Sequence, residues 1–222
     1  MKNCKNKVII FGVNDFAQLA YYYLTKDSEY EVVAFCLTND YFEENKFFCT
    51  LAIENFESIE LKYPPNLYCF FAPMSPKTMN RTRAKIYEQI KLKGYSLISY
   101  VSSKATVFNS KIGENCFILE NNTIQPFVEI GNNVILWSGN NIGHHSIIKD
   151  HVMFTSQVVL SGHCIVEEYC VFGVNSSIRD GVTISEGTFV GMASCVLKNT
   201  DSWSLYKGNP AIKSEKSTLE LE

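Results

Sequence analysis

The residues best suited to chemistry in this chain are its histidines. All four lie between residues 144 and 163, at His144, His145, His151 and His163. The pKa of imidazole is near neutrality, so a positioned histidine can take a proton from an attacking hydroxyl or amine. A lone histidine is more often structural than catalytic, but two in succession beside Gly143 favour a functional site. We therefore predict that His144 and His145 form an acid–base centre.

The sequence does not indicate a serine or cysteine nucleophile. It contains no Gly-x-Ser-x-Gly motif, which would place a reactive serine on a sharp turn. The eight cysteines are scattered without a Cys-x-x-Cys motif, which favours a reduced, cytoplasmic setting.

The histidines belong to a repeat with a period of six residues. From Ile112 to Val196 every sixth residue is apolar, and the fourth residue after each is mostly small or β-branched. This period fits neither an α-helix nor an alternating strand. It fits a short strand whose inward residues are two apart, followed by a turn. Three hexads would close one triangular coil of about 18 residues, and coils must stack to bury their apolar faces. The pattern therefore predicts a parallel β-helix.

The repeat also predicts where the chain turns. Glycine often follows the aliphatic residue directly, as at Gly113 and Gly143, and it is expected to permit the turn. Val107 is out of register with Ile112, so the regular helix is expected to begin after Val107.

The same spacing predicts where the histidines point. His144 and His145 stand two and three places after Ile142, so they are expected at an outward corner. His163 follows His145 by one coil and is expected to stack above it.

The bulk composition allows two small domains in 222 residues, with 46% hydrophobic residues. A net charge of −3 with 19% charged residues argues against a nucleic-acid surface made of basic patches. No apolar run is long enough to predict a transmembrane helix. A basic N-terminus followed by a short apolar run resembles a signal peptide, but Gly12 interrupts the run too early.

The N-terminal hundred residues alternate between apolar runs and helical patterns, which indicates a small parallel α/β unit. The expected strands are residues 7–11, 30–37, 67–71 and 96–101, and the expected helices are residues 16–26 and 75–93. We therefore predict a Rossmann-like domain at residues 1–101.

Such a sheet binds ligands beyond the carboxyl ends of its strands. The candidate substrate-binding residues at those ends are Gly12, Asn14, Asp15, Phe16, Asn39 and Asp40. The first loop lacks the second and third glycines of a dinucleotide-binding fingerprint, which disfavours NAD. A nucleotide sugar needs one helix N-terminus near a phosphate, and it is favoured. The alternative is a domain that merely caps the β-helix.

The hexads, together with the closing residues Gly208-Asn209-Pro210-Ala211, resemble the hexapeptide-repeat acyltransferases. Their fold is a left-handed parallel β-helix. The two-part layout resembles the subgroup of sialic-acid O-acetyltransferases and bacillosamine-type nucleotide-sugar N-acetyltransferases. The resemblance implies a β-helix at residues 102–212, a flexible tail at 213–222 and a homotrimer. It also implies acetyl-CoA as cosubstrate and a nucleotide-linked sugar as acceptor, in bacterial surface-glycan synthesis.

Residue roles follow from the same resemblance. The segment 141–146 matches the one that holds the family's base, which implies that His144 is the general base. The family commonly has an acidic residue next, where this chain has His145, so Asp150 and Glu120 are alternative orienting groups. The residues expected along the path of acetyl-CoA are Gly162, His163, Gly173, Ser177, Gly191, Lys198 and Lys207. The backbone N–H of Gly162 is also expected to bind the oxyanion. Phe127 and Trp137 are candidate interface anchors.

Two rival functions share this fold. The γ-class carbonic anhydrases carry zinc histidines, two of them five residues apart, and no two histidines here have that spacing. No metal site is therefore expected. The second rival is a non-catalytic β-helix scaffold, in which His144 would have no effect on turnover. Nothing in the sequence decides between N- and O-acylation.

Overall fold

The computed structural model describes residues 6–221, which fall into two compact units. The first contains the described residues up to Ser75 together with Lys85–Tyr100, and the second contains Pro76–Ala84 and the chain from Val101 onward. The segment Pro76–Ala84, which we call the strap, therefore belongs with the C-terminal repeats although the sequence pattern places it in the N-terminal domain.

The first unit is a five-stranded sheet in the order β3-β4-β2-β1-β5. Its strands are β1 (Lys7–Phe11), β2 (Glu31–Leu37), β3 (Phe47–Phe48), β4 (Leu51–Asn55) and β5 (Cys69–Phe71). All neighbours pair in parallel except β3 and β4, which form an antiparallel hairpin. The continuous apolar run at Val8, Ile9 and Ile10 is fully buried, as expected for a parallel strand.

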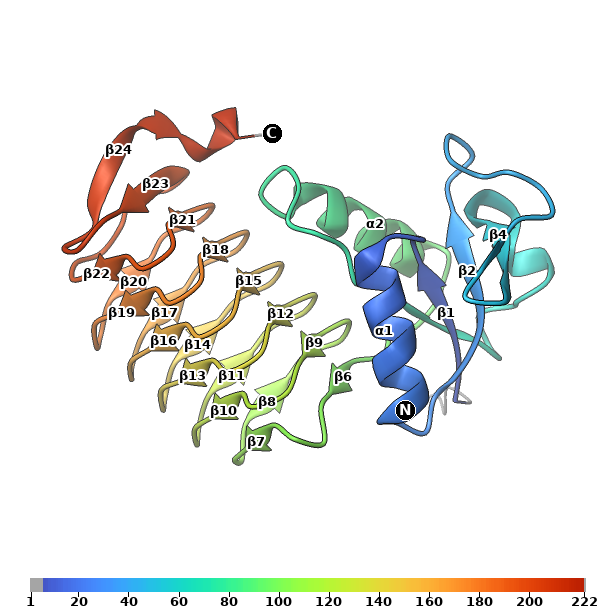
Figure 1. Ribbon diagram of the computed structural model, residues 1–222, viewed down its shortest axis with the longest axis horizontal. Helices are drawn as coiled ribbons and strands as arrows, with labels where there is room; N and C mark the ends of the chain where they lie inside the picture. The colour runs from blue at the N-terminus through green and yellow to red at the C-terminus, as the bar shows by residue number, and fades with distance from the viewer. Residues whose placement is uncertain (1–5, 222) are drawn as a thin grey trace. The chain divides into compact units, whose positions relative to one another are not determined.

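Helix α1 (Asp15–Lys26) follows β1, η1 (Phe56–Leu61) is a short 3-10 turn, and α2 (Arg81–Leu92) precedes the repeats. Helix α1 and the short turn η1 belong to this unit, whereas α2 is divided between the two units at Ala84 (Figure 1). None of the helices in residues 6–221 is long and apolar enough to cross a membrane.

Two predictions about the elements near the domain boundary were wrong. The second helix begins at Arg81 and not at residue 75, because Thr78, Met79 and Asn80 have positive φ angles that no right-handed helix accommodates. The strand expected at residues 96–101 is divided: Leu97 makes an isolated bridge with Phe70, whereas residues 100–101 join the sheet of the repeats.

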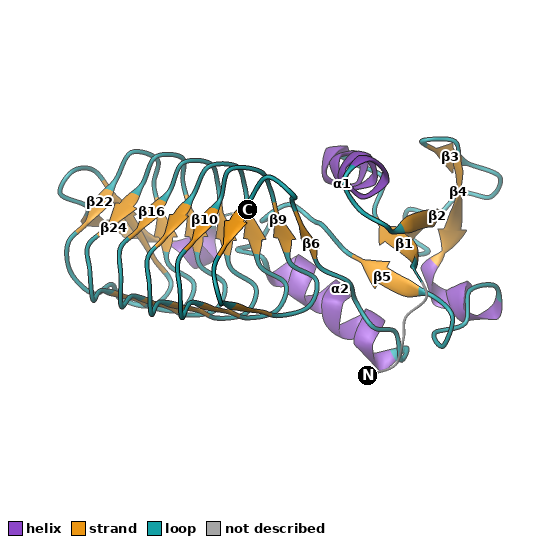
Figure 2. Ribbon diagram, turned by 90° about the horizontal axis from the view of Figure 1, so that it is seen from below, coloured by secondary structure: helices purple, strands orange, loops and turns teal. Residues whose placement is uncertain are grey.

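The second unit is a β-helix of stacked coils (Figure 2). Its short strands are β6 (Tyr100–Val101), β7 (Thr106–Val107), β8 (Lys111–Ile112), β9 (Phe117–Ile118), β10 (Thr123–Ile124), β11 (Glu129–Ile130), β12 (Ile135–Leu136), β13 (Asn141–Ile142), β14 (Ile147–Ile148), β15 (Met153–Phe154), β16 (Val159–Leu160), β17 (Ile165–Val166), β18 (Val171–Phe172), β19 (Ser177–Ile178), β20 (Thr183–Ile184), β21 (Phe189–Val190) and β22 (Cys195–Val196). Each pairs in parallel with the equivalent strand of the next coil, as Leu136 does with Phe154.

The coils form three sheets. Sheet one contains β7, β10, β13, β16, β19 and β22; sheet two contains β8, β11, β14, β17 and β20; sheet three begins with β6 and β9 and ends with β21, β23 and β24. The inward residues are almost fully buried in one continuous apolar core. The thiols of Cys116, Cys164 and Cys170 are buried there too, which confirms that they are small core residues.

The helix starts two strands earlier than predicted, with β6 and β7. Thr106 and Val107 form β7 and pair with Thr123 and Ile124 of the next coil. The corner between Val107 and Ile112 is one residue shorter than a hexad, so the register shift shortens a turn without ending the helix.

The turns are made by a different residue from the one predicted. The left-handed backbone occurs three places after the aliphatic residue, as at Asn115 (φ 55°), Asn133 (φ 58°) and His145 (φ 58°). Asparagine and histidine tolerate this conformation better than most residues. Glycine after the aliphatic residue has another function: a Cβ on Gly113 would lie 2.5 Å from the carbonyl oxygen of Gly131. Glycine there permits close approach of the next coil.

The described residues end in a hairpin and a 3-10 turn, which extend into the segment expected to be a flexible tail. Strand β23 (Ser204–Lys207) pairs with β24 (Ile212–Ser217), and η2 (Thr218–Glu220) follows. Thr218 is buried and donates a hydrogen bond from Oγ1 to the carbonyl oxygen of Gly187 at 2.8 Å. The open edge of the last coil provides the backbone partners that order this segment.

Candidate active site

Three histidine rings meet at one corner of the β-helix. His144 and His145 occupy the turn between sheets one and two, and His163 occupies the same turn one coil later. The Nδ1 atoms of His144 and His145 are 3.1 Å apart. The ring of His163 stacks on that of His145 at 5.0 Å and meets that of His144 edge to face at 5.0 Å. All three side chains are exposed, as the repeat predicted for an outward corner.

The main chain fixes the positions of these rings. His145 and His163 both adopt the left-handed turn conformation, with φ angles of 58° and 56°. The N–H of His163 donates to the carbonyl oxygen of His144 at 2.9 Å, and the N–H of His144 donates to Oε1 of Gln125 at 2.9 Å. Because each ring projects from a paired coil, the cluster is set by the stacking of the helix.

Gly162 lies directly under the His144 ring. A Cβ built on Gly162 would be 2.8 Å from Cε1 and 3.0 Å from Nε2 of His144, and 3.1 Å from Oδ1 of Asp180. Among residues 6–221 no acceptor is seen for the N–H of Gly162, which is a buried residue. The absence of a side chain on Gly162 leaves space for the edge of the His144 imidazole.

The group beside His144 is His145, and neither expected carboxylate lies there. Asp150 accepts hydrogen bonds from the backbone N–H and the side-chain amide of Asn132. Glu120 accepts one from Ser138 Oγ at 2.7 Å. Both carboxylates occupy other corners of the triangle, so neither orients the imidazole of His144.

His151, the fourth histidine, lies at a different corner. There it belongs to a row of stacked side chains from equivalent positions of successive coils, namely Asn115, Asn133, His151 and Tyr169. Its Nδ1 is 2.9 Å from Nδ2 of Asn133, and its ring stacks on that of Tyr169 at 5.1 Å. Burial, followed by the nearby charge of Arg83, lowers the pKa of His151 to about 4, and Asp150 opposes this shift. His151 is therefore neutral at physiological pH.

The residues expected along the path of acetyl-CoA fall on one side of the β-helix. Gly173 and Gly191 lie at the turn that leads into sheet one, and Ser177 lies on β19 of that sheet. Gly162 and His163 lie at the turn that follows the same sheet. A Cβ on Gly173 would be 2.4 Å from the backbone nitrogen of Met192, so this glycine is required by coil stacking.

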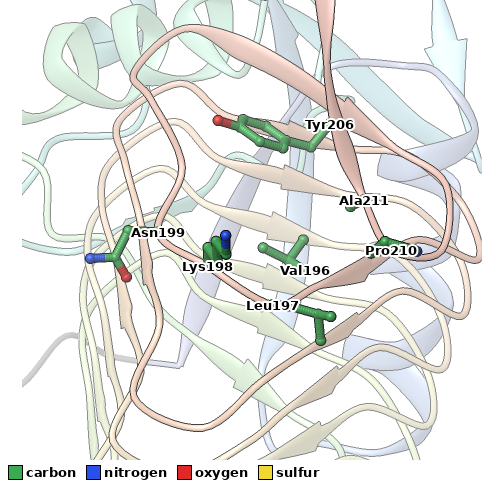
Figure 3. Close-up of a pocket in the computed structure, with 7 residues that line it drawn as sticks. All are labelled: Val196, Leu197, Lys198, Asn199, Tyr206, Pro210 and Ala211. Atoms are coloured by element: carbon green, nitrogen blue, oxygen red, sulfur yellow. The ribbon is translucent and has the colours of Figure 1, made fainter.

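A cleft of about 400 Å³ lies at the C-terminal end of the helix (Figure 3). It is lined by Val196, Leu197, Lys198, Asn199, Tyr206, Pro210 and Ala211. The cis peptide bond before Pro210 lies in the closing motif recognised in the sequence. Lys207 lies nearby on β23, where its Cβ is 3.3 Å from the position that a Cβ on Gly191 would take.

The candidate substrate residues lie at the carboxyl end of the first unit's sheet. Gly12 has a φ of 103° and donates its N–H to the carbonyl oxygen of Cys36, at the end of the neighbouring strand β2. Asn14 caps helix α1 by accepting from the N–H of Ala17 at 3.3 Å, and Asp15 begins the helix. Phe16, in the first turn, is half-buried.

The loop after β2 is held by its own side chains. Asn39 accepts from Nδ2 of Asn55 at 2.6 Å and donates its N–H to Glu57 at 3.0 Å. Asp40 follows, with an exposed side chain. The topology thus brings the ends of β1 and β2 together, as the alternating pattern predicted.

Two residues of the corner were missed in the sequence. Gln125 contacts the backbone of His144, and Asp180 lies beside Gly162. A signal for Asp180 existed, because it follows Gly162 by one coil and so must stack on it. Phe127, a candidate interface anchor, is exposed and has its ring 4.7 Å from that of His145, while Trp137 is half-buried.

Comparisons with known proteins agree with this architecture. The family model for the bacterial transferase hexapeptide, with six repeats, matches residues 109–144. A histidine variant of perosamine N-acetyltransferase from Caulobacter crescentus, solved with CoA and GDP-perosamine, is similar over 95% of this chain and 97% of its own, with a TM-score of 0.83 and 20% identity.

Two further solved structures have the same layout. The acetyltransferase domain of PglB from Neisseria gonorrhoeae aligns over 95% of this chain and 100% of its own, with a TM-score of 0.82 and 18% identity. WeeI from Acinetobacter baumannii aligns over 93% and 99%, with a TM-score of 0.80 and 16% identity. The chain therefore carries bacterial transferase hexapeptide repeats and has the fold of these proteins, an N-terminal α/β unit followed by a left-handed parallel β-helix.

Proposed function

We propose that the protein transfers an acetyl group from acetyl-CoA to an amino or hydroxyl group of a nucleotide-linked sugar. The observation that carries this proposal is the His144 imidazole, which is exposed at a corner of the β-helix with its ring edge against Gly162. Two similar structures support it, one solved with CoA and GDP-perosamine and the other with acetyl coenzyme A. The proposal includes a cytoplasmic, homotrimeric enzyme of bacterial surface-glycan synthesis.

His144 acts as the general base in this mechanism. Its Nδ1 faces His145, which leaves Nε2 to accept the proton of the acceptor. Nε2 is basic only if Nδ1 carries the ring proton and donates it to Nδ1 of His145. His145 is therefore proposed as the group that selects the tautomer of His144, in the position where related enzymes commonly have a carboxylate.

The N–H of Gly162 is proposed to stabilise the charge that develops on the thioester oxygen. As His144 removes the proton, the sugar nitrogen or oxygen bonds to the thioester carbon. The carbon–sulfur bond then breaks, the acetyl group stays on the sugar, and CoA leaves as a thiolate that takes up a proton. Because Gly162 lies on the coil next to His144, one corner provides both the base and the oxyanion donor.

Acetyl-CoA is proposed to lie along sheet one. Gly173, Gly191 and Ser177 present little side-chain bulk there, which suits the approach of an extended pantetheine arm. The cleft at the C-terminal end is proposed to hold the nucleotide end of CoA, where Lys198 and Lys207 are suited to attract phosphates as point charges.

The acceptor's nucleotide is proposed to bind at the carboxyl end of the first unit's sheet. Gly12 allows a phosphate to approach the backbone closely. Asp15 disfavours a phosphate at the very start of α1 and is better suited to accept hydrogen bonds from hydroxyl groups. Asn39 and Asp40 are proposed to contribute further polar contacts.

The experiment is a panel of nucleotide-linked amino sugars and hydroxyl sugars, each incubated with acetyl-CoA, with the acetylated product quantified by mass spectrometry. Replacement of His144 by Asn should lower kcat by about 10²- to 10⁴-fold, because the general base is lost. The matched control is His151→Asn, the same substitution at a histidine that lies at a different corner. This variant should retain turnover. Full activity of the His144 variant would refute His144 as the base, whereas absence of transfer by the wild type to every sugar in the panel would favour a scaffold.

A further inference from the structure

The three histidines of the corner have a geometry that general-base catalysis does not require. A single base and one orienting partner suffice for proton removal, yet His163 adds a third imidazole. One ring nitrogen of each of His144, His145 and His163 lies within 4.8 Å of the others. All three rings are exposed, so a small cation can reach them.

The distances fit a divalent transition metal. Zinc binds imidazole nitrogen at about 2.0–2.1 Å, so two nitrogens on one tetrahedral ion are about 3.3 Å apart. The Nδ1 atoms of His144 and His145 are 3.1 Å apart. Three protein ligands with a fourth position left for water is a common zinc arrangement. The ligand type excludes Mg²⁺ and Ca²⁺, which prefer oxygen, and favours Zn²⁺ and its neighbours.

The site is largely assembled before any ion arrives. His145 and His163 project from equivalent turns of adjacent coils, joined by the hydrogen bond from the N–H of His163 to the carbonyl oxygen of His144. Little chain ordering is needed on binding, because the backbone is already fixed by the β-helix. Binding requires a change of side-chain rotamer, because the three nitrogens lie within 4.8 Å of one another, which is longer than the separation on one ion.

We propose that His144, His145 and His163 form an inhibitory binding site for Zn²⁺. The ion replaces the proton shared between the two Nδ1 atoms and holds the His144 ring, which then no longer accepts a proton from the acceptor. The inhibitory effect rests on the proposed acetyl transfer, whereas the binding itself does not. The reaction needs no metal, and the cation switches it off by occupying the base.

The binding experiment titrates Zn²⁺ into the full-length, tag-free protein by calorimetry, and compares His163→Asn with His151→Asn. Asparagine tolerates the left-handed backbone at both positions, so each variant is expected to fold. The wild type and the His151 variant should bind one equivalent per chain with equal affinity. The His163 variant should bind at least tenfold more weakly. Equal affinity of wild type and the His163 variant would overturn the proposal.

A second measurement replaces Zn²⁺ by Co²⁺, whose visible absorption reports the ligands directly. A band that appears in the wild type and the His151 variant, and is lost in the His163 variant, supports the site. Absence of the band in the wild type counts against it.

The activity measurement adds one equivalent of Zn²⁺ and quantifies acetylated sugar, since released CoA thiol would itself bind the metal. The wild-type rate should fall at least tenfold, and excess chelator should restore it. Binding at the three histidines without any acetyl transfer would refute the proposed function and leave the site standing. Transfer that is unaffected by saturating Zn²⁺ would refute the inhibition and leave the proposed function standing.

Discussion

At Gly162 the imidazole of His144 lies where a side chain would otherwise be. A methyl group there would lie 2.8 Å from Cε1 of His144, and all of its nearest neighbours are side-chain atoms that can move. Gly162→Ala should therefore fold, with the His144 ring displaced. We expect kcat to fall by about 10²-fold, since small misplacements of catalytic groups have effects of this size. Steady-state kinetics and a melting curve measure the two effects.

The matched control is Gly173→Ala. Its new methyl group would lie 2.4 Å from the backbone nitrogen of Met192, which cannot move aside. This variant should lose stability, whereas Gly162→Ala should lose turnover. A Gly162 variant with wild-type kinetics would show that His144 does not act from the observed position.

A buried arginine of the strap, Arg83, donates hydrogen bonds to the coils of the β-helix. The Arg83 side chain is fully buried; Nη1 donates to the carbonyl oxygen of Asn133, and Nη2 donates to Asn80 Oδ1 at 3.0 Å and to the carbonyl oxygens of His151 and Val152. Burial lowers the pKa of Arg83 to about 9, so the guanidinium stays charged at neutral pH.

Replacing Arg83 by Met should therefore destabilise the protein. Several buried carbonyl groups would lose a charged donor, and we expect the free energy of unfolding to fall by about 3 kcal/mol. Arg81→Met is the matched control, because that exposed guanidinium lies 5.7 Å from the Trp203 ring and contributes about 0.5–1 kcal/mol. Denaturant unfolding of both variants measures the difference, and equal losses would contradict this role of Arg83.

The row that contains His151 predicts a pH dependence of stability. The unfolded histidine takes up a proton near pH 6.5, but burial delays protonation in the folded protein to about pH 4. The unfolded state thus binds more protons between these values, and the free energy of unfolding falls as the pH is lowered through this window. Once the pH is below both pKa values, the free energy of unfolding has fallen by an amount on the order of 3 kcal/mol.

His151→Asn removes this dependence. Asparagine would extend the row of Asn115 and Asn133, whose side chains are already hydrogen-bonded at 2.8 Å. Denaturant unfolding at pH 7 and pH 4.5 should show a smaller difference between the two pH values for the variant than for the wild type. An identical difference would mean that another group causes the acid sensitivity.

At the scale of the whole molecule, outward apolar side chains predict self-association. Ile147 and Ile165 are neighbours on sheet two and are 40% and 37% exposed. We expect light scattering to give the mass of three chains, and Ile165→Glu to shift it towards one chain, because a carboxylate in an apolar interface is left without water. The control is Met192→Glu, because Met192 lies at the turn between sheets three and one and its side chain is more exposed than that of Ile165. A wild-type mass of one chain would contradict this prediction.

The sequence by itself determined the repeating architecture. Every hexad must bury the same two inward positions, so the six-residue pattern from Ile112 to Val196 specified the core. The stacking interval then placed His163 above His145 correctly, since equivalent residues of successive coils lie in one row. The alternating pattern of the first hundred residues likewise predicted β1, α1, β2 and β5.

Only the tertiary structure decided what fills the spaces between coils. The partner of His144 is the adjacent His145, because side-chain direction at a turn depends on φ angles that the pattern does not specify. Gly143 permits close approach of the next coil, whereas Gly162 leaves space for the His144 ring, and both functions depend on the actual separation of adjacent coils. Arg83 and Thr218 contact coils far away in the sequence. A local period reports which residues face inward, but long-range contacts depend on how separate segments pack in three dimensions.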